Sequence, residues 1–394
     1  MKILFLMLQM PDENGGSGMY VDLCEEMQAN GHDVIVMAPD NAFSKTYLHA
    51  ERGMRVLRIK CRKILGEKNM VKKGVGLAMM PYYYRRAYKK FIRAEKFDWI
   101  FMPTPPITLI DFVGYAKKIS RAKFYLILRD IHPQSAHSIG LIKHRFMYDY
   151  LEKRARKGYE LADRIGCMSQ GNIDFVSLNY PNIDTSKLVL LYNWITPNLQ
   201  GRELQVREKY GLNDKFVALF GGNIGLGQRI ENIVFLAKHY LKNDHIRFVI
   251  IGKGVEKSRL MEINKDEGLI NVIFIDFMPQ PDYLSFVQNV DLGLISINEN
   301  YKVPTCPSKA VSYMALGIPI FAMINPNSDY GRFIEDSGAG YFVVGTNKDE
   351  TVRKFDAIYG DAILRKRMSD AGKKFFDTNL TTKKAYEVIN SQII

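Results

Sequence analysis

Two glycine-rich loops in the second half of the chain have a composition that suits an anion. Residues 221–225 read GGNIG and lead into Gln228 and Arg229. Glycine lets a ligand approach the main-chain amides, and the positive end of a following helix favours a negative group, to which Arg229 adds a full charge. Residues 252–254 (GKG) follow another predicted strand, and neither loop has the third glycine of a dinucleotide fingerprint. Two such loops in one domain indicate a nucleoside diphosphate.

A lysine further along the chain points to the same chemistry. Residues 304–309 read PTCPSK and precede a helix predicted over 310–316. Ser308 is a candidate N-cap, which places Lys309 in the first turn. A cation there opposes the helix dipole unless an anion shares the site, so Lys309 favours a phosphate ligand. The alternative interpretation is an exposed, solvated lysine.

The first half of the chain carries a different set of reactive groups. Residues 129–133 read RDIHP and directly follow an apolar run. At the end of a strand, Arg129, Asp130 and His132 could contact an acceptor hydroxyl or transfer its proton. The alternative is a strand-end turn capped by Asp130. His132 and His137 with Asp130 lack a recognised metal-ligand spacing, and no metal site is predicted.

A third glycine-rich segment lies between the first apolar run and the first amphipathic stretch. It consists of Gly15, Gly16, Ser17 and Gly18. The NAD fingerprint would require a further glycine where Val21 stands, so a dinucleotide is not indicated. We expect this loop to bind a polar ligand on the acceptor side, and the alternative is a plain tight turn.

All these loops follow predicted strands, and this defines the fold class. Apolar runs alternate with amphipathic stretches, and the pattern restarts near residue 216. The sequence therefore predicts two doubly wound α/β domains, joined at about 194–202, with ligands beyond the carboxyl ends of the strands. The predicted strands are 3–8, 34–37, 99–102, 124–128, 164–168, 188–192, 216–220, 248–251, 272–275, 292–297, 320–323 and 341–344, and the predicted helices include 19–30, 108–120, 146–161 and 230–240.

Composition narrows the class of protein. The 394 residues suffice for two domains, and the formal net charge of +13 favours anionic partners such as phosphates, nucleic acid or acidic lipids. The four cysteines form no C-x-x-C pair, which argues against a zinc knuckle or a redox motif and fits a reducing compartment. Neither a signal peptide nor a membrane-spanning run is evident, so we expect a cytoplasmic protein that is peripheral to a membrane.

The membrane expectation rests on residues 61–93. This segment contains ten Lys or Arg residues and one acid, Glu67, around an apolar and aromatic centre. Basic flanks around such a centre suit the headgroup boundary of an anionic membrane. The alternative is a solvated helix pair whose apolar side packs on the first domain.

Several motifs together resemble glycosyltransferase family 4, in the branch near bacterial aminosugar transferases of O-antigen and capsule assembly. They are, in order, GGSGMYVDLCEEMQANGHDVIVMAP, LRDIHPQSAHSIG, LADRIGCMSQGNIDFV, VLLYNW, LFGGNIGLGQ, VIIGKGVEKSRL, NVIFIDFMPQPDYLSFVQNVDLGLISI and CPSKAVSYMALGIPIF. The resemblance implies the GT-B fold, two Rossmann-like domains that face an interdomain cleft. It implies an acceptor domain over 1–195, a nucleotide-sugar domain over 203–372, and a C-terminal helix, 373–394, that returns to the first domain.

The resemblance also implies a reaction. A sugar would move with retention of configuration from a nucleoside-diphosphate donor, such as a UDP-sugar, to a polyprenyl-diphosphate-linked acceptor, without an obligatory metal or other cofactor. The leaving diphosphate would be stabilised by amides and cations. The implied catalytic residues are Asp130, His132 and Arg129, and the acceptor-binding residues are Gly15, Gly16, Ser17 and Gly18. The predicted donor-binding residues, among which Arg229 is assigned from its charge and not from the resemblance, are Gly222, Asn223, Gly225, Gln228, Arg229, Gly252, Lys253, Gly254, Phe277, Ser308, Lys309 and Ser312.

This sequence departs from the family pattern at several of these positions. Asn223 and Gln228 stand where many members have Arg and Lys, so Lys309 and Arg229 would have to supply the charge. The paired glutamates of the family fall on Pro304 and Ser312, and a serine binds a ribose hydroxyl less strongly than a carboxylate does. The histidine that is frequent in the first domain of the family falls on Arg129, with His132 three residues on. The general base therefore stays open, and a phosphate oxygen of the donor is one candidate.

Two other functions remain compatible with the sequence. A nucleotide-sugar 2-epimerase on the same fold would need no acceptor and no membrane-facing segment. A non-catalytic binder, of nucleic acid or as a scaffold, is compatible with the missing glutamates, although no nucleic-acid motif is present.

Overall fold

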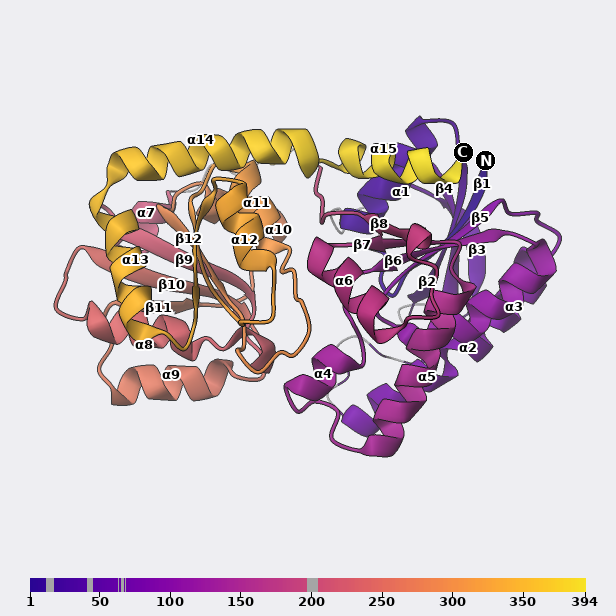
Figure 1. The fold of residues 1–394 in the computed structure, drawn as a ribbon, viewed down its shortest axis with the longest axis horizontal. Coiled ribbons are helices and arrows are strands. Elements are labelled where there is room, and N and C mark those ends of the chain that lie inside the picture. Colours follow the sequence, from indigo (N-terminus) through magenta and orange to yellow (C-terminus); the bar gives the residue numbers. More distant parts are fainter. Residues whose placement is uncertain (12–17, 41–44, 63, 65–66, 68, 197–204) are drawn as a thin grey trace. The chain divides into compact units, whose positions relative to one another are not determined.

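The chain folds into two compact units. The computed structural model describes residues 1–11, 18–40, 45–62, 64, 67, 69–196 and 205–394. One unit consists of residues 1–192 and 382–394, and the other of residues 193–381 (Figure 1). Each unit has its own hydrophobic core and is described by itself below.

The described residues of the first unit form an eight-stranded sheet in the order β3-β4-β2-β1-β5-β6-β7-β8. All neighbouring pairs are parallel except β3 and β4, which form a hairpin. The chain therefore winds in opposite directions from β1, which makes the carboxyl ends of β1 and β5 a topological switch point. The strands are β1 (Lys2–Leu6), β2 (Asp33–Asp40), β3 (Tyr47–Glu51), β4 (Met54–Lys60), β5 (Trp99–Pro103), β6 (Lys123–Leu128), β7 (Arg164–Cys167) and β8 (Leu188–Leu190).

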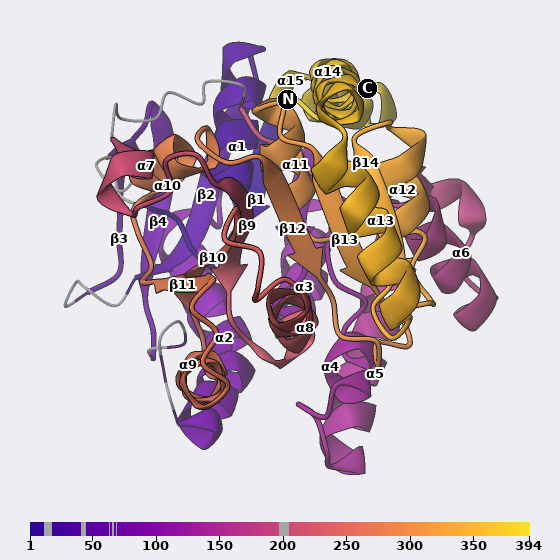
Figure 2. The ribbon, with the colours of Figure 1, turned by 90° about the vertical axis from the view of Figure 1, so that its left-hand side faces the viewer.

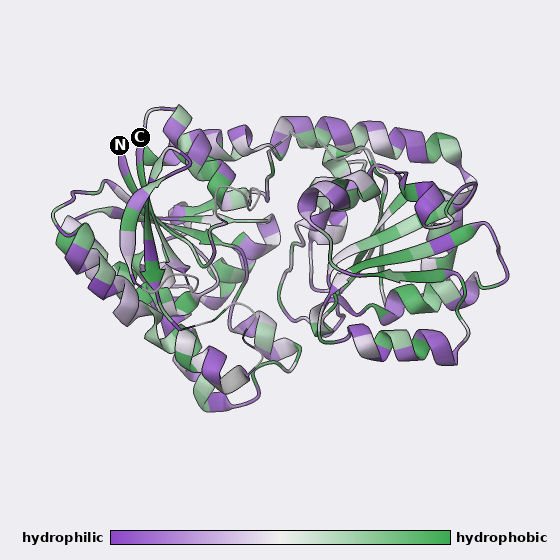
Figure 3. Ribbon diagram, turned by 180° about the vertical axis from the view of Figure 1, so that it is seen from behind, coloured by the Kyte–Doolittle hydropathy of each residue, from purple (hydrophilic) through white to green (hydrophobic). Residues whose placement is uncertain are grey.

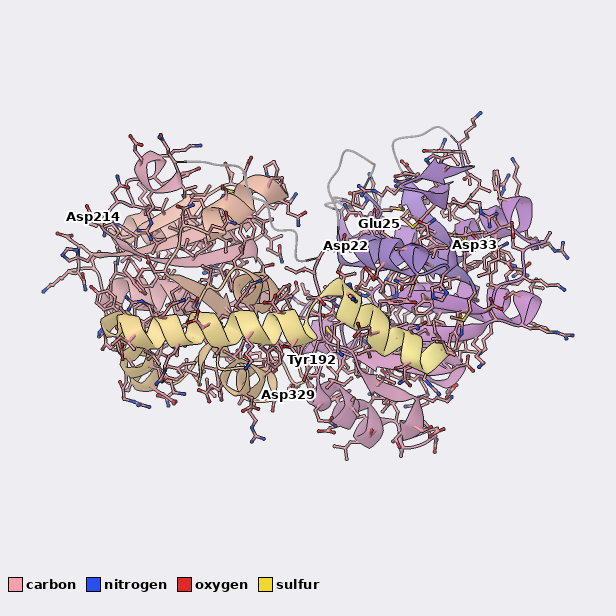
Figure 4. All side chains as sticks on the ribbon, turned by 90° about the horizontal axis from the view of Figure 1, so that it is seen from above. Asp22, Glu25, Asp33, Tyr192, Asp214 and Asp329 are labelled. Carbon is pink, nitrogen blue, oxygen red and sulfur yellow. The ribbon has the colours of Figure 1, made fainter. Side chains whose placement is uncertain are left out.

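The last helix of the chain belongs to this first unit. Figure 4 shows α15 alongside α1, the helix that carries Asp22 and Glu25. The Trp99 indole donates a hydrogen bond to the carbonyl oxygen of Ile393 (3.2 Å), which fastens the terminus to β5. The helices of this unit are α1 (Met19–Ala29), α2 (Met70–Phe91), η1 (Ile107–Leu109), α3 (Ile110–Ser120), α4 (Gln134–Ser138), α5 (Arg145–Leu161), α6 (Gln170–Asn179), η2 (Thr185–Lys187) and α15 (Thr382–Ile393).

The second unit has a parallel sheet in the order β11-β10-β9-β12-β13-β14 over its described residues. In chain order within the unit this is 3-2-1-4-5-6, the arrangement of dinucleotide-binding α/β domains, with its switch point between β9 and β12. The strands are β9 (Phe216–Asn223), β10 (Ile246–Lys253), β11 (Val272–Ile275), β12 (Leu292–Ser296), β13 (Ile320–Ile324) and β14 (Gly340–Val344).

Helices follow these strands in regular alternation. The helix α14 runs unbroken to Asn379 as part of the second unit, so residues 382–394, and not the whole of 373–394, belong to the first unit. The helices of the second unit are α7 (Val206–Lys209), η3 (Leu226–Gln228), α8 (Glu231–His239), α9 (Lys257–Asp266), α10 (Gln280–Val287), α11 (Lys309–Ala315), α12 (Tyr330–Asp336), α13 (Lys348–Gly360) and α14 (Ala362–Asn379).

The strands of both sheets are hydrophobic along most of their length, as Figure 3 shows. The strands β5 and β13, for example, are buried at all five positions, as expected where helices cover both faces of a parallel sheet. The prediction of two Rossmann-like α/β domains is confirmed. The hairpin of β3 and β4 was not predicted, because Arg55 and Arg58 interrupt the apolar run of β4.

Over its described residues, the basic segment 61–93 contains one long helix, α2, rather than a helix pair. Met80, Tyr84 and Tyr88 on one side of α2 are fully buried in the core of the first unit. The packing interpretation is therefore correct for that side, while the opposite side is exposed. No helix in the described part of the chain combines the length and the apolar character needed to cross a bilayer.

Candidate active site

The predicted donor loops lie beyond the carboxyl ends of β9 and β10. The pairing of these two strands continues through the glycines, with Gly222 opposite Gly252 and Lys253 opposite Asn223. A Cβ atom added at Gly252 would overlap the carbonyl oxygen of Gly222, and one added at Gly254 would overlap that of Ile224. Gly252 and Gly254 are thus required for the two strand ends to approach each other, whether or not a ligand is bound.

Lys309 is the cation that the fold brings to these strand ends. Its ammonium nitrogen lies 4.8 Å from the centroid of the Phe220 ring, and its Cε atom would be 2.8 Å from a Cβ added at Gly222. Desolvation by the surrounding packing lowers the pKa of Lys309 from 10.5 to about 8. Across the described residues, no carboxylate forms an ion pair with it. A desolvated cation without a counter-ion is a strong attractor for an anion.

The other polar groups of this loop are engaged with protein partners. The side-chain amide of Asn223 donates a weak hydrogen bond to Oε1 of Gln228 (3.4 Å). The guanidinium of Arg229 forms an ion pair with Glu299 (3.2 Å) and lies 4.0 Å from Glu231. Arg229 therefore does not add an uncompensated charge, and Lys309 is the principal cation of the loop.

Three residues that the sequence analysis missed hold the loop in place. The side-chain amide of Asn298, which follows β12, donates to the carbonyl of Leu226 (2.8 Å), and its main-chain amide donates to Gly227 (2.9 Å). The Tyr313 hydroxyl donates to the carbonyl of Leu219 (3.0 Å), and the Tyr283 ring occupies the space that a side chain at position 221 would fill. A polar residue just after a strand was the signal for Asn298, whereas the tyrosines resemble ordinary core residues.

The remaining donor-side predictions fall on accessible positions. Phe277, just beyond β11, is 62% exposed, and the Lys253 ammonium lies 4.4 Å from the centroid of its ring. Ser308 precedes α11, and its hydroxyl caps no amide in the described chain, so the predicted side-chain cap is wrong. Ser312 lies one turn along α11 from Lys309 and is half-buried.

The catalytic residues predicted in the first unit lie beyond the carboxyl end of β6. The main-chain amide of Arg129 donates to the Thr104 hydroxyl (3.1 Å), which ties this loop to the neighbouring end of β5. Part of the Asp130 side chain is exposed, but the protein atoms crowded around its carboxyl group raise its pKa, which Arg129 only partly opposes. Desolvation lowers the pKa of the half-buried His132 to about 4. Near pH 7 His132 is therefore a neutral imidazole.

The start of α1 lies close to these groups. A guanidinium nitrogen of Arg129 donates to the sulfur of Met19. Burial raises the pKa of the neighbouring Tyr20, while the charge of Arg129 lowers it slightly and the charge of Asp130 raises it slightly. Gly18 precedes α1 in an extended conformation. The other predicted acceptor residues, Gly15, Gly16 and Ser17, lie outside the described residues.

His137, which was considered as a metal ligand, makes structural contacts instead. Its Nδ1 atom lies 2.7 Å from the carbonyl oxygen of Ile142, and its ring packs against Tyr148. These contacts hold the turn between α4 and α5. The described ranges contain no group of three or more His, Cys, Asp or Glu side chains arranged to hold a metal ion.

Comparison with known proteins gives the class of the second unit. Residues 203–375 match the family model described as glycosyl transferases group 1. This range covers the sheet β9–β14 and the loops around Lys309, so the second unit is a glycosyltransferase domain and the chain is a transferase.

Two relatives match most of the chain. The protein named as glycosyltransferase WbjE of Pseudomonas aeruginosa is 24% identical over 275 residues, which are 68% of this chain and 67% of the relative. The protein named as colanic acid biosynthesis glycosyl transferase WcaI of Escherichia coli K12 is 22% identical over 347 residues, 80% of this chain and 82% of the relative.

Solved structures identify the fold as GT-B. Sucrose-phosphate synthase from Thermosynechococcus elongatus has a TM-score of 0.74 at 13% identity, covering 99% of this chain and 97% of its own. Anabaena HepE in complex with UDP has a TM-score of 0.68 at 15% identity, covering 100% and 99%. At these identities the likeness concerns the fold alone, and the predicted cleft between the domains stays a prediction.

Proposed function

We propose that this chain is a retaining glycosyltransferase of bacterial surface polysaccharide synthesis, which transfers an N-acetyl aminosugar from a UDP-type donor to a polyprenyl-diphosphate-linked acceptor. The observation that carries the proposal is Lys309, a desolvated ammonium group beside Gly222 at the switch point of a 3-2-1-4-5-6 sheet. A sugar diphosphate provides the negative charge that this position lacks.

On the donor side, the diphosphate would lie between Lys309 and the amides near Gly222. HepE, a structure of the same fold, is in complex with UDP, which supports a uridine nucleotide. Ser312, one turn from Lys309, would bond a ribose hydroxyl, and the exposed ring of Phe277 would stack on the base. These assignments deepen the match of residues 203–375 to a transferase family.

On the acceptor side, Asp130, His132 and Arg129 would receive the sugar hydroxyl. The lowered pKa of His132 keeps its imidazole neutral, and the raised pKa of Asp130 makes its carboxylate a better proton acceptor than an ordinary aspartate. The WcaI name, which refers to colanic acid biosynthesis, supports a surface polysaccharide as the product. The exposed basic side of α2 supports a peripheral position at the inner face of the cytoplasmic membrane, where such lipids are found.

The chemical step requires only the donor-side and acceptor-side residues named above and the two substrates. The acceptor oxygen attacks the anomeric carbon on the face from which the diphosphate leaves, so one C–O bond forms as the other breaks and the configuration is retained. Negative charge grows on the leaving phosphate oxygen, where Lys309 and the loop amides stabilise it. The acceptor proton passes to Asp130 or to that phosphate oxygen.

The test is a binding and transfer experiment on the full chain. UDP or the correct UDP-sugar should raise the midpoint of thermal unfolding, since a ligand at a hundredfold excess over its Kd stabilises by about 2.7 kcal/mol. Radiolabelled UDP-sugars incubated with polyprenyl-diphosphate sugars should then yield labelled lipid with retained configuration. Isomerisation of the donor without an acceptor would instead identify an epimerase, and binding of DNA with no nucleotide affinity would contradict a transferase.

A further inference from the structure

The turn between α4 and α5 exposes an unusual set of side chains. Leu141, Phe146 and Met147 are 52%, 83% and 46% exposed, although they are large and apolar. Lys143, His144 and Arg145, which are also exposed, lie between them in sequence. We call these six residues the α5 corner. Contiguous apolar side chains at a surface mark an interaction site more often than isolated ones do.

The exposure of the α5 corner is not the result of a loose turn. Ile142, in its middle, is 6% exposed and is therefore anchored in the fold. The carbonyl oxygen of Ile142 lies 2.7 Å from the His137 ring nitrogen, and the carbonyl of His144 accepts hydrogen bonds from the amides of Met147 and Tyr148 (3.1 Å each). The backbone is thus held in a conformation that presents Phe146 to solvent.

The charges around the corner have one sign. Residues 131–148 contain no Asp or Glu. Among the described residues, one acid pairs with the corner: Asp149 lies 3.7 Å from Arg145. Both side chains are exposed, so this ion pair contributes little stability in water. The surface would therefore bind most favourably to a partner that carries negative charges at its surface and an apolar layer beneath them.

A second surface of the same kind lies on α2. Val75, Met79 and Tyr82 follow one another at helical spacing and are 42%, 37% and 54% exposed. The helix, residues 70–91, contains six Lys or Arg residues and no acid. Figures 1 and 2 show the starts of α2 and α5 both extending to the lower side of the first unit.

We propose that the α5 corner is a membrane anchor, which inserts Phe146, Leu141 and Met147 at the headgroup boundary of an anionic bilayer while Lys143 and Arg145 contact the lipid phosphates. This rests on the proposed function, to which it adds a second contact besides α2. Two contacts on one side of the first unit would fix its orientation on the bilayer, whereas a single helix would allow the unit to rotate about the helix axis.

Other occupants fit the surface less well. A two-fold contact between copies of this chain would bring Lys143 and Arg145 against their own counterparts, which costs energy. Nucleic acid would satisfy the cations but would leave Leu141 and Met147 without an apolar environment. An anionic bilayer satisfies both kinds of group.

The experiment measures co-sedimentation of the full chain with large vesicles. Wild type should bind vesicles of phosphatidylglycerol and phosphatidylcholine, and bind phosphatidylcholine alone at least tenfold more weakly. The variant Leu141→Ser with Phe146→Ser should reduce binding to the anionic vesicles by about tenfold or more, because two buried apolar side chains are lost. Replacing Lys143 and Arg145 by Gln should reduce it by about tenfold and weaken its dependence on salt.

Matched controls carry the same changes elsewhere. Leu178→Ser with Ile363→Ser removes side chains that are 80% and 78% exposed, on α6 and α14, and should leave vesicle binding unchanged. Lys242→Gln with Lys265→Gln removes the same net charge from exposed positions of the second unit. Thermal stabilisation by UDP, measured on every variant, reports the donor site and the integrity of the fold separately from lipid binding.

The outcomes separate the two proposals. Loss of vesicle binding in the corner variants, with UDP stabilisation retained, supports the anchor. Equal binding of corner variants and wild type to anionic vesicles would overturn it, as would a change from dimer to monomer in the corner variants without any effect on vesicle binding. Failure of UDP to stabilise the wild type, alongside intact lipid binding, would instead count against the transferase proposal alone.

Discussion

The carboxyl ends of the two parallel sheets gather polar residues in the same topological position but with opposite electrostatic character. In the second unit, Lys309 is a cation whose neighbours remove water without supplying a counter-ion. In the first unit, desolvation by the neighbouring protein atoms keeps the imidazole of His132 neutral and raises the pKa of the Asp130 carboxyl group. Under the proposed function, the same strand-end position would bind a diphosphate in one unit and an uncharged hydroxyl in the other.

The difference indicates how two domains of the same fold can bind the two different substrates of one transfer reaction. Rossmann-like sheets place ligands at their carboxyl ends, but the type of ligand depends on which side chains are desolvated there. Desolvation of the Lys309 ammonium group, which has no carboxylate partner among the described residues, raises its affinity for an anion. Desolvation of the His132 imidazole instead favours its neutral form. Each prediction below perturbs one side of this contrast.

The largest effect is expected for Lys309→Met. The substitution removes the cation and keeps the length of the side chain, so kcat for transfer should fall by about 10²–10³-fold through loss of charge stabilisation on the leaving phosphate. Affinity for UDP should fall by about 10–100-fold, the value of a charge-assisted hydrogen bond. Calorimetric titration with UDP and initial rates measure the two. Lys242→Met serves as the control, and wild-type affinity in K309M would show that the anion does not bind there.

Asp130→Asn should affect turnover but not donor binding. If Asp130 accepts the acceptor proton, kcat should fall by about 10²-fold or more, the usual contribution of a general base, with the Kd for UDP unchanged. A donor phosphate that takes the proton instead would leave D130N within a few-fold of wild type. His132→Gln, which keeps a neutral polar side chain, is the companion variant and should be milder.

The pH dependence should distinguish the two units. Above pH 8 the free protein loses the proton on Lys309, while a bound diphosphate restores it. Affinity for UDP should therefore fall by about fivefold between pH 8 and 9, and the proton uptake on binding should rise toward one proton over this interval. Calorimetry in buffers of different ionisation enthalpy measures this uptake. In K309M the uptake should disappear.

The same group acts on stability in the opposite direction. Between pH 8 and 10.5 the unfolded chain holds a proton at Lys309 that the native chain lacks. The contribution of Lys309 to the free energy of unfolding therefore increases as pH rises through this window. For His132 the window runs from 6.5 down to about 4, and stability is lost as pH falls through it. Denaturant unfolding of wild type and His132→Gln across that window should show a smaller acid loss in the variant.

The smallest effect is expected for Phe277→Ala. Its ring is exposed and contacts Lys253, so truncation should leave the fold intact and lower UDP affinity by about fivefold to tenfold through loss of a stacking face. Inorganic diphosphate, which has no base, should bind F277A and wild type equally. A comparable loss for both ligands would place the effect of Phe277 at the phosphate rather than at the base.

Much of the fold was predictable because its signals are local. Runs such as 248–251 and 272–275 are apolar along their length and match β10 and β11, since strands covered on both faces need no polar alternation. The glycine loops and the RDIHP segment could be assigned to strand ends for the same reason. The hairpin of β3 and β4 could not, because Arg55 and Arg58 hide its pattern. The buried guanidinium of Arg58 is satisfied by the Glu51 carboxylate and by the carbonyl oxygen of Met10.

The roles of the charged residues were less predictable than their positions. From the sequence, Arg229 and Lys309 were equally good candidates for phosphate ligands. In the structure, Glu299, 70 residues away in the chain, pairs with Arg229, whereas no described carboxylate pairs with Lys309. In α2, helical spacing showed a basic and apolar helix, yet not which side Tyr84 and Tyr88 would bury.

By itself, the sequence determined the two α/β domains, the glycine loops at their strand ends and the candidate reactive groups, because periodicity and turn chemistry act over a few neighbouring residues. Only the tertiary structure decided which cation lacks a partner, which carboxyl and imidazole groups lose water, and which apolar side chains stay exposed at the α5 corner. These properties depend on contacts between segments distant in the chain, since desolvation and ion pairing are set by whatever packs nearby.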